Sequence, residues 1–357
     1  MRDVMSKQMP IIESLLDLDF YKLTMLQFIW RRHRDVPVTF TFKNRTADVG
    51  LGTFVQLVHL QRELDHVRSL RFTDAEIAYL ATLDTFDTEF LTWLRDGFRL
   101  SDIEVGVDAA DAQLRIEVSG PWSQVTLWET IVLAIVNELY YREVWKRNGS
   151  TRRDLYPGGY DRFHAKCVIL LRRPDIKVVE FGTRRRHSRE WQRAVVADLR
   201  DLVSGNLLGT SNVFLAKELG LKPIGTFAHE LDMVYSGIYR DRLRESHQIM
   251  LRDWWDEYGE PLSIALTDTY TSDFFFEDMT EEQARKWRGL RQDSGDPFAF
   301  AEKAIAFYER HGVDPTTKTI IFSDGLDVEK IVQLAGHCRG RIGYAFGWGT
   351  NLTNDVG

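Results

Sequence analysis

Two turns near the end of the sequence combine residue types that bind anions. They follow the apolar runs 320–323 and 344–347. Their members are small, polar or aromatic: Asp324, Gly325, Trp348, Gly349, Thr350 and Asn351. Glycine, threonine and asparagine offer free backbone N–H groups and short polar side chains, which suit phosphate oxygens. One such turn can simply close a strand, but two at successive strand ends favour a phosphate or sugar-phosphate site.

Three aspartates stand just past apolar runs that read as buried strands: Asp268, Asp293 and Asp324. A carboxylate in this place can hold a pair of ribose hydroxyls. It can also join a Mg²⁺ shell, because Mg²⁺ binds through one or two carboxylates plus phosphates and water. Each aspartate can equally cap a following helix. The pattern alone leaves both roles open.

Arginines and aromatic residues occupy the same predicted loops. A run of three arginines, Arg184 to Arg186, follows one predicted strand, and Arg291 with Asp293 follows another. A guanidinium binds two oxygens of a phosphate or carboxylate at once, although such a run can also be a solvated charged loop. Tyr21 and Phe181 stand in or beside these polar stretches and either sandwich a flat ring or belong to the core.

His229 ends the run 225–228, which we predict to be a strand. A neutral imidazole is a nucleophile toward phosphorus, and much of it is neutral near pH 7. A histidine at a strand end can also serve only as a structural hydrogen-bonding group. The segment 229–233 lacks the second histidine of a zinc-protease motif, and the sequence contains neither a P-loop nor a GxSxG elbow.

The elements that position these residues form two predicted units. From about residue 163, strands and helices alternate at least five times, and each strand ends in a polar loop; the segment 223–230 is one of these strand-and-loop units. This pattern is typical of a parallel β/α barrel with its site at the carboxyl ends of the strands. The predicted class is therefore α/β, an irregular β/α barrel behind an N-terminal α+β domain.

The earlier part of the chain reads as helices and alternating strands. Ser14 or Asp17 can cap a first helix within 14–34. Further predicted elements are a strand after Pro37, helices at 51–70, 74–83 and 87–94, two strands within 103–118, and a buried helix at 122–145. The charged stretch 146–161, with Pro157, Gly158 and Gly159, reads as a surface loop. The predicted divisions are 1–120, the α+β domain; 121–162, a helical linker and loop; and 163–357, the barrel.

Composition bounds the class of protein. A chain of 357 residues is long enough for two domains. A net charge of -7 argues against a general nucleic-acid binder. Two widely spaced cysteines imply no disulfide framework, which fits a reducing compartment. The most apolar stretch, 130–136, is too short to cross a bilayer, so we expect a cytoplasmic enzyme without a membrane partner.

Seven blocks, in order, resemble the nicotinate phosphoribosyltransferases, a family of type II phosphoribosyltransferases. They are DLDFYKLTM, EFGTRRRHS, GTSNVFLAKELGLKPIGTFAHE, ALTDTY, LRQDSGDP, FSDGLDVEKI and FGWGTNLTND. The resemblance implies transfer of phosphoribose from 5-phosphoribosyl 1-pyrophosphate to nicotinate, with Mg²⁺ carried by the substrate phosphates. It also implies coupled ATP hydrolysis through a phosphorylated His229, and a homodimer whose partner supplies Tyr21 opposite Phe181. Family members usually continue past the last block, so the family's C-terminal tail is expected to be absent from this sequence.

The resemblance also assigns roles to single residues. The catalytic residues would be His229, Asp293 and Asp324. The nicotinate site would comprise Tyr21, Phe181, Ser211, Thr226 and Arg291. The phosphoribosyl pyrophosphate site would comprise Arg184, Asp268, Ser294, Gly295, Gly325, Gly349, Thr350 and Asn351. A neutral Ser211, in place of an acid, should favour nicotinate over nicotinamide. Two alternative interpretations are a related enzyme acting on nicotinamide or quinolinate, and a non-catalytic nucleotide-binding protein.

Overall fold

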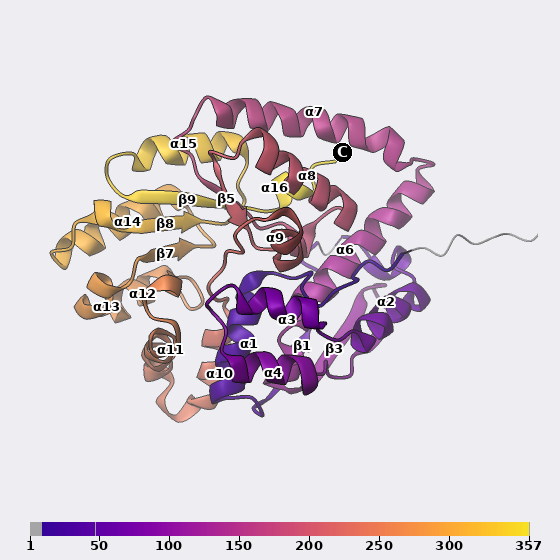
Figure 1. The fold of residues 1–357 in the computed structure, drawn as a ribbon, viewed down its shortest axis with the longest axis horizontal. Helices are drawn as coiled ribbons and strands as arrows, with labels where there is room; N and C mark the ends of the chain where they lie inside the picture. Colours follow the sequence, from indigo (N-terminus) through magenta and orange to yellow (C-terminus); the bar gives the residue numbers. More distant parts are fainter. Residues whose placement is uncertain (1–8, 47, 357) are drawn as a thin grey trace, which may run out of the picture.

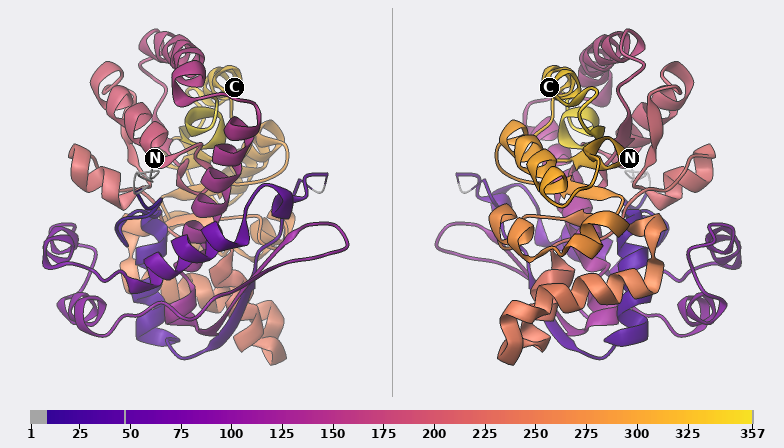
Figure 2. Two further views of the ribbon diagram at one scale, coloured as in Figure 1. Left: turned by 90° about the vertical axis from the view of Figure 1, so that its right-hand side faces the viewer. Right: turned by 90° about the vertical axis from the view of Figure 1, so that its left-hand side faces the viewer.

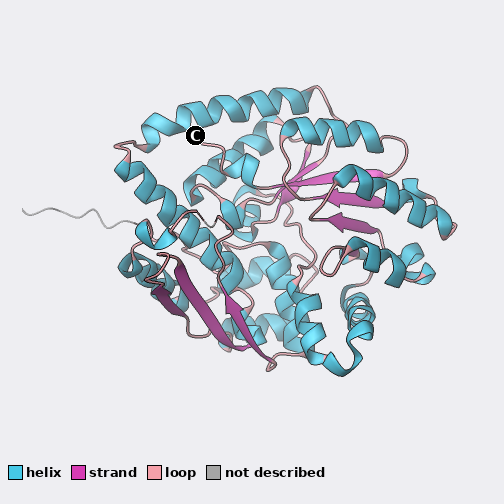
Figure 3. Ribbon diagram, turned by 180° about the vertical axis from the view of Figure 1, so that it is seen from behind, coloured by secondary structure: helices cyan, strands magenta, loops and turns pink. Residues whose placement is uncertain are grey.

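The computed structural model describes residues 9–46 and 48–356, so the parts of the predicted domains at 1–8 and 357 lie outside the described residues. The chain forms two sheets, which Figure 3 shows well apart. One is antiparallel with the order β1-β3-β2, and the other is parallel with the order β5-β4-β9-β8-β7-β6. The class predicted from the sequence, an α+β unit followed by an irregular β/α barrel, is confirmed (Figure 1).

The N-terminal unit packs helices against the antiparallel sheet. Its elements are β1 (Pro37–Thr41), η1 (Leu51–Thr53), α2 (Leu57–Ser69), α3 (Asp74–Ala81), α4 (Thr88–Asp96), β2 (Glu104–Val107) and β3 (Leu114–Pro121). Side chains of β3 alternate between buried and exposed from Leu114 to Ser119, as expected of a strand with one wet face. The buried face joins an apolar core that includes Leu60, Leu64 and Phe90.

Helix α1 (Phe20–Arg32) belongs to both units. Its residues Met25 and Phe28 pack into the barrel core, whereas Leu23 and Leu26 pack into the N-terminal core. The capping residue is Asp19, so the prediction of Ser14 or Asp17 is wrong. Those two side chains are engaged elsewhere, Ser14 with Glu76 and Asp17 with Arg186.

The connection between the units is almost entirely helical. Helices α5 (Trp122–Val125) and α6 (Trp128–Arg147) confirm the predicted buried helix. The predicted surface loop at 146–161 is wrong, because α7 (Arg152–Leu171) runs through Pro157. Thr151 and Asp154 form a capping box that starts this helix, and Pro157 lies only in its second turn. A proline there forfeits one intrahelical hydrogen bond, and the helix continues.

The parallel strands are short and buried, and helices cover them. The strands are β4 (Val178–Glu180), β5 (Leu207–Thr210), β6 (Ile264–Leu266), β7 (Gly289–Gln292), β8 (Thr319–Phe322) and β9 (Gly343–Trp348). The helices are η2 (Thr183–Arg185), α8 (Arg189–Leu202), α9 (Val213–Leu219), α10 (Glu230–Ile238), η3 (Arg240–Arg242), α11 (Leu243–Tyr258), η4 (Glu260–Leu262), α12 (Ser272–Asp278), α13 (Glu281–Lys286), α14 (Pro297–Arg310), η5 (Pro315–Thr317), α15 (Val328–Cys338) and α16 (Thr350–Thr353). Those of the last third, orange to yellow, gather on one side in Figure 2.

The gap between β5 and β6 is spanned without a regular strand. The Thr210 amide donates to the Lys222 carbonyl at 3.1 Å, and the Thr226 hydroxyl donates to the Ile264 carbonyl, also at 3.1 Å. The segment 223–230 has a single isolated bridge, from Pro223 to Thr210, so the strand predicted within this strand-and-loop unit is wrong. A side chain on Gly225 would lie 2.9 Å from the Tyr21 amide nitrogen, so α1 packs closely against this segment.

Candidate functional site

His229 stands at the start of α10, where a carboxylate holds its ring. Its Nε2 lies 3.0 Å from Oδ1 of Asp268, on the loop after β6, and the side chain is 37% exposed. Burial alone would raise the pKa of Asp268, but hydrogen bonds from His229 and Ser294 outweigh it and lower that pKa. An ionised carboxylate only accepts hydrogen bonds, so Nε2 carries the proton and Nδ1 has the free lone pair.

Arg291 on β7 is fixed by three partners. Its Nη2 lies 2.7 Å from Asp293 Oδ2, its Nε donates to Ser323 Oγ at 3.1 Å, and its Nη1 donates to the Phe227 carbonyl at 3.1 Å. Ser323 in turn donates to Asp293 Oδ1 at 2.6 Å. The same Asp293 lies 3.9 Å from His229 Nε2. The loops after β6 and β7 and the start of α10 therefore bring His229, Arg291 and Asp293 together.

A second group comes from the start of α1 and the loops after β4 and β5. The Ser211 hydroxyl donates to Asp19 Oδ1 at 2.6 Å, and Arg184 Nε lies 3.6 Å from the other oxygen of Asp19. Arg184 also stands over the Tyr21 ring, with its Cζ 5.8 Å from the ring centroid. Tyr21 therefore lies beside Arg184 of its own chain, and its supply by a partner subunit stays a prediction.

The two groups lie next to each other. The Thr24 hydroxyl of α1 donates to the Thr226 carbonyl at 2.7 Å, which places the first turn of α1 against the segment that leads to His229. Burial raises the pKa of the Tyr21 hydroxyl well above its ordinary value, although the nearby charges of Arg184 and Arg291 oppose this rise. Tyr21 is thus neutral and within electrostatic reach of both arginines.

Phe181 lies where β4 meets β9. Its amide donates to the Trp348 carbonyl at 2.9 Å. A side chain on Gly347 would come within 3.5 Å of the Phe181 ring, and one on Gly349 within 3.0 Å of the Phe181 carbonyl. Among the ring contacts of residues 9–46 and 48–356, none joins Tyr21 to Phe181. Because Gly347 and Gly349 have no side chains, their backbone can lie close to the half-buried Phe181.

The other predicted site residues lie on exposed or half-buried turns after the strands. Gly295 and Gly325 have positive φ values of 79° and 54°, which only glycine adopts without strain. Asp324 and Thr350 are exposed. Within the described residues, Asn351 Oδ1 is buried without a hydrogen-bond partner.

The three consecutive arginines have three different environments. Arg186 is 0% exposed and bonds both oxygens of Asp17, at 2.7 and 2.8 Å, so no ligand can use it. Arg184 contacts Asp19. Arg185 is exposed, and among the described residues its guanidinium has no hydrogen bond or ion pair. Partial burial and the nearby charges of Arg184 and Arg45 lower the pKa of Arg185, while Asp293 and Asp324 oppose this.

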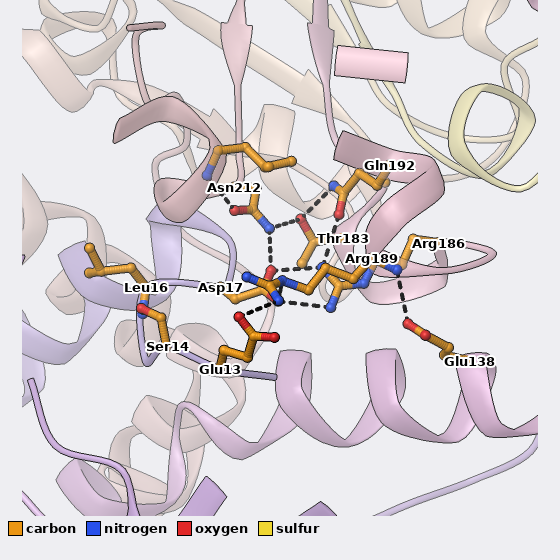
Figure 4. Close-up of polar contacts among 12 residues, drawn as sticks. Glu13, Ser14, Leu16, Asp17, Glu138, Thr183, Arg186, Arg189, Gln192 and Asn212 are labelled. Atoms are coloured by element: carbon orange, nitrogen blue, oxygen red, sulfur yellow. Dashed lines mark hydrogen bonds and ion pairs between the residues drawn. The ribbon is translucent and has the colours of Figure 1, made fainter. Parts of the chain in front are cut away.

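The Asp17–Arg186 pair anchors the loop that carries Arg184 and Arg185. The Asn212 amide donates to Asp17 at 2.7 Å and to Thr183 at 3.2 Å, and Gln192 also bonds Thr183 (Figure 4). The bonds drawn in Figure 4 join α8, α9 and the start of the chain to this loop, although Arg186 Nε is buried without a hydrogen-bond partner among the described residues.

Sequence reasoning missed Asp19 and Arg185. Asp19 was visible only as part of the block DLDFYKLTM, and the arginine run did not show which member stays free. No three His, Cys, Asp or Glu side chains among the described residues are grouped to hold a metal ion.

Comparisons with known proteins agree with this geometry. The model of the nicotinate phosphoribosyltransferase (NAPRTase) family matches residues 176–357, and the model of its N-terminal domain matches residues 16–137. A crystal structure of nicotinate phosphoribosyltransferase from Porphyromonas gingivalis is 35% identical, covering 97% of this chain and 87% of that one, with a TM-score of 0.88.

Two further solved structures are similar over most of the chain. The nicotinate phosphoribosyltransferase from Vibrio cholerae is 38% identical, with 98% of this chain and 82% of that one covered and a TM-score of 0.87. A putative nicotinate phosphoribosyltransferase from Saccharomyces cerevisiae is 28% identical, with coverage of 97% and 86% and a TM-score of 0.83. Together with the two family matches, these likenesses show that the chain belongs to the nicotinate phosphoribosyltransferase family.

Proposed function

We propose that this chain transfers the phosphoribosyl group of 5-phosphoribosyl 1-pyrophosphate to nicotinate and couples the transfer to ATP hydrolysis. The transfer is the reaction of its family and a step in the salvage of nicotinate for NAD. The pyridine nitrogen forms a bond to the ribose C1 as the bond from C1 to pyrophosphate breaks. One observation carries the coupled function: a histidine held by a carboxylate lies 3.9 Å from the aspartate that also binds Arg291.

The protein's part in the transfer is positioning. Displacement at the ribose carbon passes through a cation-like state, which aligned reactants and complementary charges stabilise. Tyr21 and Phe181 offer flat faces to the pyridine ring. Arg291 suits the nicotinate carboxylate, which would share the guanidinium with Asp293.

We assign the ATP-dependent step to His229. Nδ1 would attack the γ-phosphorus of ATP, so that a nitrogen–phosphorus bond forms, the bond to the bridging oxygen breaks and ADP leaves. The imidazole becomes cationic in this step, and the ionised Asp268 at Nε2 supports that charge. This role differs from the predicted one, in which Asp268 binds the phosphoribosyl group.

Selection of nicotinate over nicotinamide is assigned to Ser211. The Ser211 hydroxyl donates its proton to Asp19. Ser211 therefore presents an uncharged oxygen, and not a carboxylate, to its other neighbours. Burial raises the pKa of Asp19, with opposition from Arg184 and Ser211. A second carboxylate at position 211 would therefore meet a buried one already in place.

Magnesium would bind through the substrate. Asp324 is exposed and, with Asp293, supplies the one or two carboxylates that a Mg²⁺–pyrophosphate complex typically uses. Bound Mg²⁺ would neutralise charge on the departing pyrophosphate. Arg185 would serve the same phosphates, because its guanidinium lies near both aspartates.

We further propose a homodimer in a reducing, cytoplasmic setting. Cys167 and Cys338 are buried and unpaired, which supports such a compartment. In the described part of the chain, no helix has the length and apolar character required to span a membrane. A sedimentation measurement tests the dimer, with a monomer at micromolar concentration as the contradicting result.

A pyrophosphate-release assay tests the function. Nicotinate and phosphoribosyl pyrophosphate are mixed with the enzyme, with and without ATP, and nicotinamide and quinolinate serve as competing pyridines. We expect release with nicotinate that ATP accelerates. Incubation of His229→Asn with γ-labelled ATP should leave no acid-labile label on the protein, and persistent label would contradict the assignment of His229.

A further inference from the structure

A buried ammonium group lies between the two halves of the site. Lys22, in the first turn of α1, is 0% exposed. Its Nζ lies 2.6 Å from Glu129 Oε2 on α6 and also contacts Glu230 Oε2 on α10. Burial alone would lower the pKa of Lys22, but the two carboxylates outweigh it and raise that pKa. Lys22 therefore stays charged and holds both acids.

The two carboxylates lead to opposite ends of the site. The second oxygen of Glu129 lies 3.1 Å from Nη1 of Arg184, and the charges of Lys22 and Arg184 overcome burial and lower the pKa of Glu129 to about 2. Glu230 follows His229 directly in the chain and accepts a hydrogen bond from Trp122 Nε1 at 2.5 Å. Contacts thus run without a break from Arg184 through Lys22 to the first turn of α10.

We propose that Lys22 is a positioning residue that couples the state of His229 to the phosphoribosyl site at Arg184. A phosphoryl group on His229 adds negative charge at the start of α10, and Glu230 is the side chain of that turn tied to Lys22. Any shift of Glu230 changes how Lys22 holds Glu129, and with it the placement of Arg184. This inference rests on the proposed ATP coupling.

The alternative to coupling is a purely structural role. Loss of Lys22 leaves Glu129 and Glu230 as neighbouring carboxylates in a buried place, which lowers stability whatever the catalytic role. A test therefore needs a measured ratio that does not depend on the stability of the variant. The ratio of kcat/KM for phosphoribosyl pyrophosphate with ATP to that without ATP meets this need, because both values come from the same folded protein.

The experiment compares four proteins: wild type, Lys22→Met, Glu129→Gln and Lys318→Met. Lys318 is the matched control, a buried lysine that donates to the carbonyls of Arg285 and Trp287 at 2.7 Å, at the amino end of β8. We expect Lys22→Met and Glu129→Gln to lose about fivefold or more of the ATP-dependent ratio. ATP consumed per mononucleotide should rise in the same two variants, and Lys318→Met should keep the wild-type ratio.

The outcomes separate the inference from the function beneath it. An ATP-dependent ratio within about twofold of wild type in folded Lys22→Met or Glu129→Gln overturns the inference and leaves the proposed function intact. If Lys22→Met fails to fold, the near-isosteric Glu129→Gln decides alone. Absence of any ATP effect in the wild type overturns both the inference and the proposed coupling.

Discussion

His187 makes the stability of this protein sensitive to mild acid. Its side chain is 1% exposed and its ring lies between Tyr141 and Trp145, with centroid distances of 4.5 and 4.6 Å. Its Nδ1 lies 3.3 Å from Asn354 Oδ1, and its amide donates to the Thr353 carbonyl at 2.9 Å. Burial lowers the pKa of His187 from 6.5 to about 4, so the folded protein keeps this ring neutral.

The sign follows from proton linkage. The unfolded chain takes up a proton near pH 6.5, whereas the folded protein resists until about pH 4, so stability is full above pH 6.5 and falls through this window. Taking one pKa unit as about 1.4 kcal/mol, the difference between pH 7 and pH 5 is about 2 kcal/mol from this residue. Protonation of His187 therefore weakens the contact between the loop at 184–186 and α16, because His187 bonds Thr353 and Asn354.

Thermal unfolding at pH 7 and pH 5 measures this effect. Substitution His187→Phe keeps an aromatic ring between Tyr141 and Trp145 and removes the titration, so its loss of stability on acidification should be about 2 kcal/mol smaller than that of wild type. The substitution His59→Gln, at an exposed position on α2, controls for loss of a histidine as such. Equal losses in wild type and His187→Phe would refute the reasoning.

Three further substitutions test the site and its scaffold. Arg185→Ala should raise KM for phosphoribosyl pyrophosphate about tenfold, the size of one lost charged hydrogen bond, with little change in kcat. Gly289→Ala should destabilise the protein by roughly 1–3 kcal/mol in denaturant titrations, because its Cβ would meet the Thr319 carbonyl oxygen at 1.9 Å. Ser211→Asp should lower the preference for nicotinate over nicotinamide in kcat/KM, since a carboxylate beside Asp19 repels the acid substrate.

Matched variants give these results their meaning. Arg193→Ala removes an exposed arginine that pairs with Glu218 away from the site, and its KM should stay at the wild-type value. Gly205→Ala places a methyl group where no atom lies within 4 Å, so it should unfold like wild type. An unchanged KM in Arg185→Ala, an unchanged midpoint in Gly289→Ala, or an unchanged substrate ratio in Ser211→Asp would each count against the corresponding contact.

Much of the barrel could be predicted because its signals are local. Each buried strand is a short apolar run, and the turn after it carries glycine, aspartate or arginine. The local sequence pattern therefore predicts β6, β7, β8 and β9 and their polar ends. Parallel strands place their carboxyl ends on one edge, which is why His229, Arg291 and Asp293 meet.

The errors and omissions have long-range causes. Pro157 reads as a helix breaker, but the capping box at Thr151 prevails. The segment 223–230 contains a short apolar run, but α1, some two hundred residues earlier, packs against it at Gly225 and Thr226. The same distance hides the contact of Lys22 with Glu230, since partners in an ionic cluster are chosen by tertiary packing and leave no periodic trace.

The division of α1 between two cores determines which fragments of this chain can fold alone. A barrel expressed from residue 163 onward would lack Met25 and Phe28, and the wall at Thr226 would face water where α1 now rests. An N-terminal fragment ending at 120 would keep this helix but bare one of its apolar sides. Neither fragment contains a complete core, so neither should show a cooperative melting transition when produced alone.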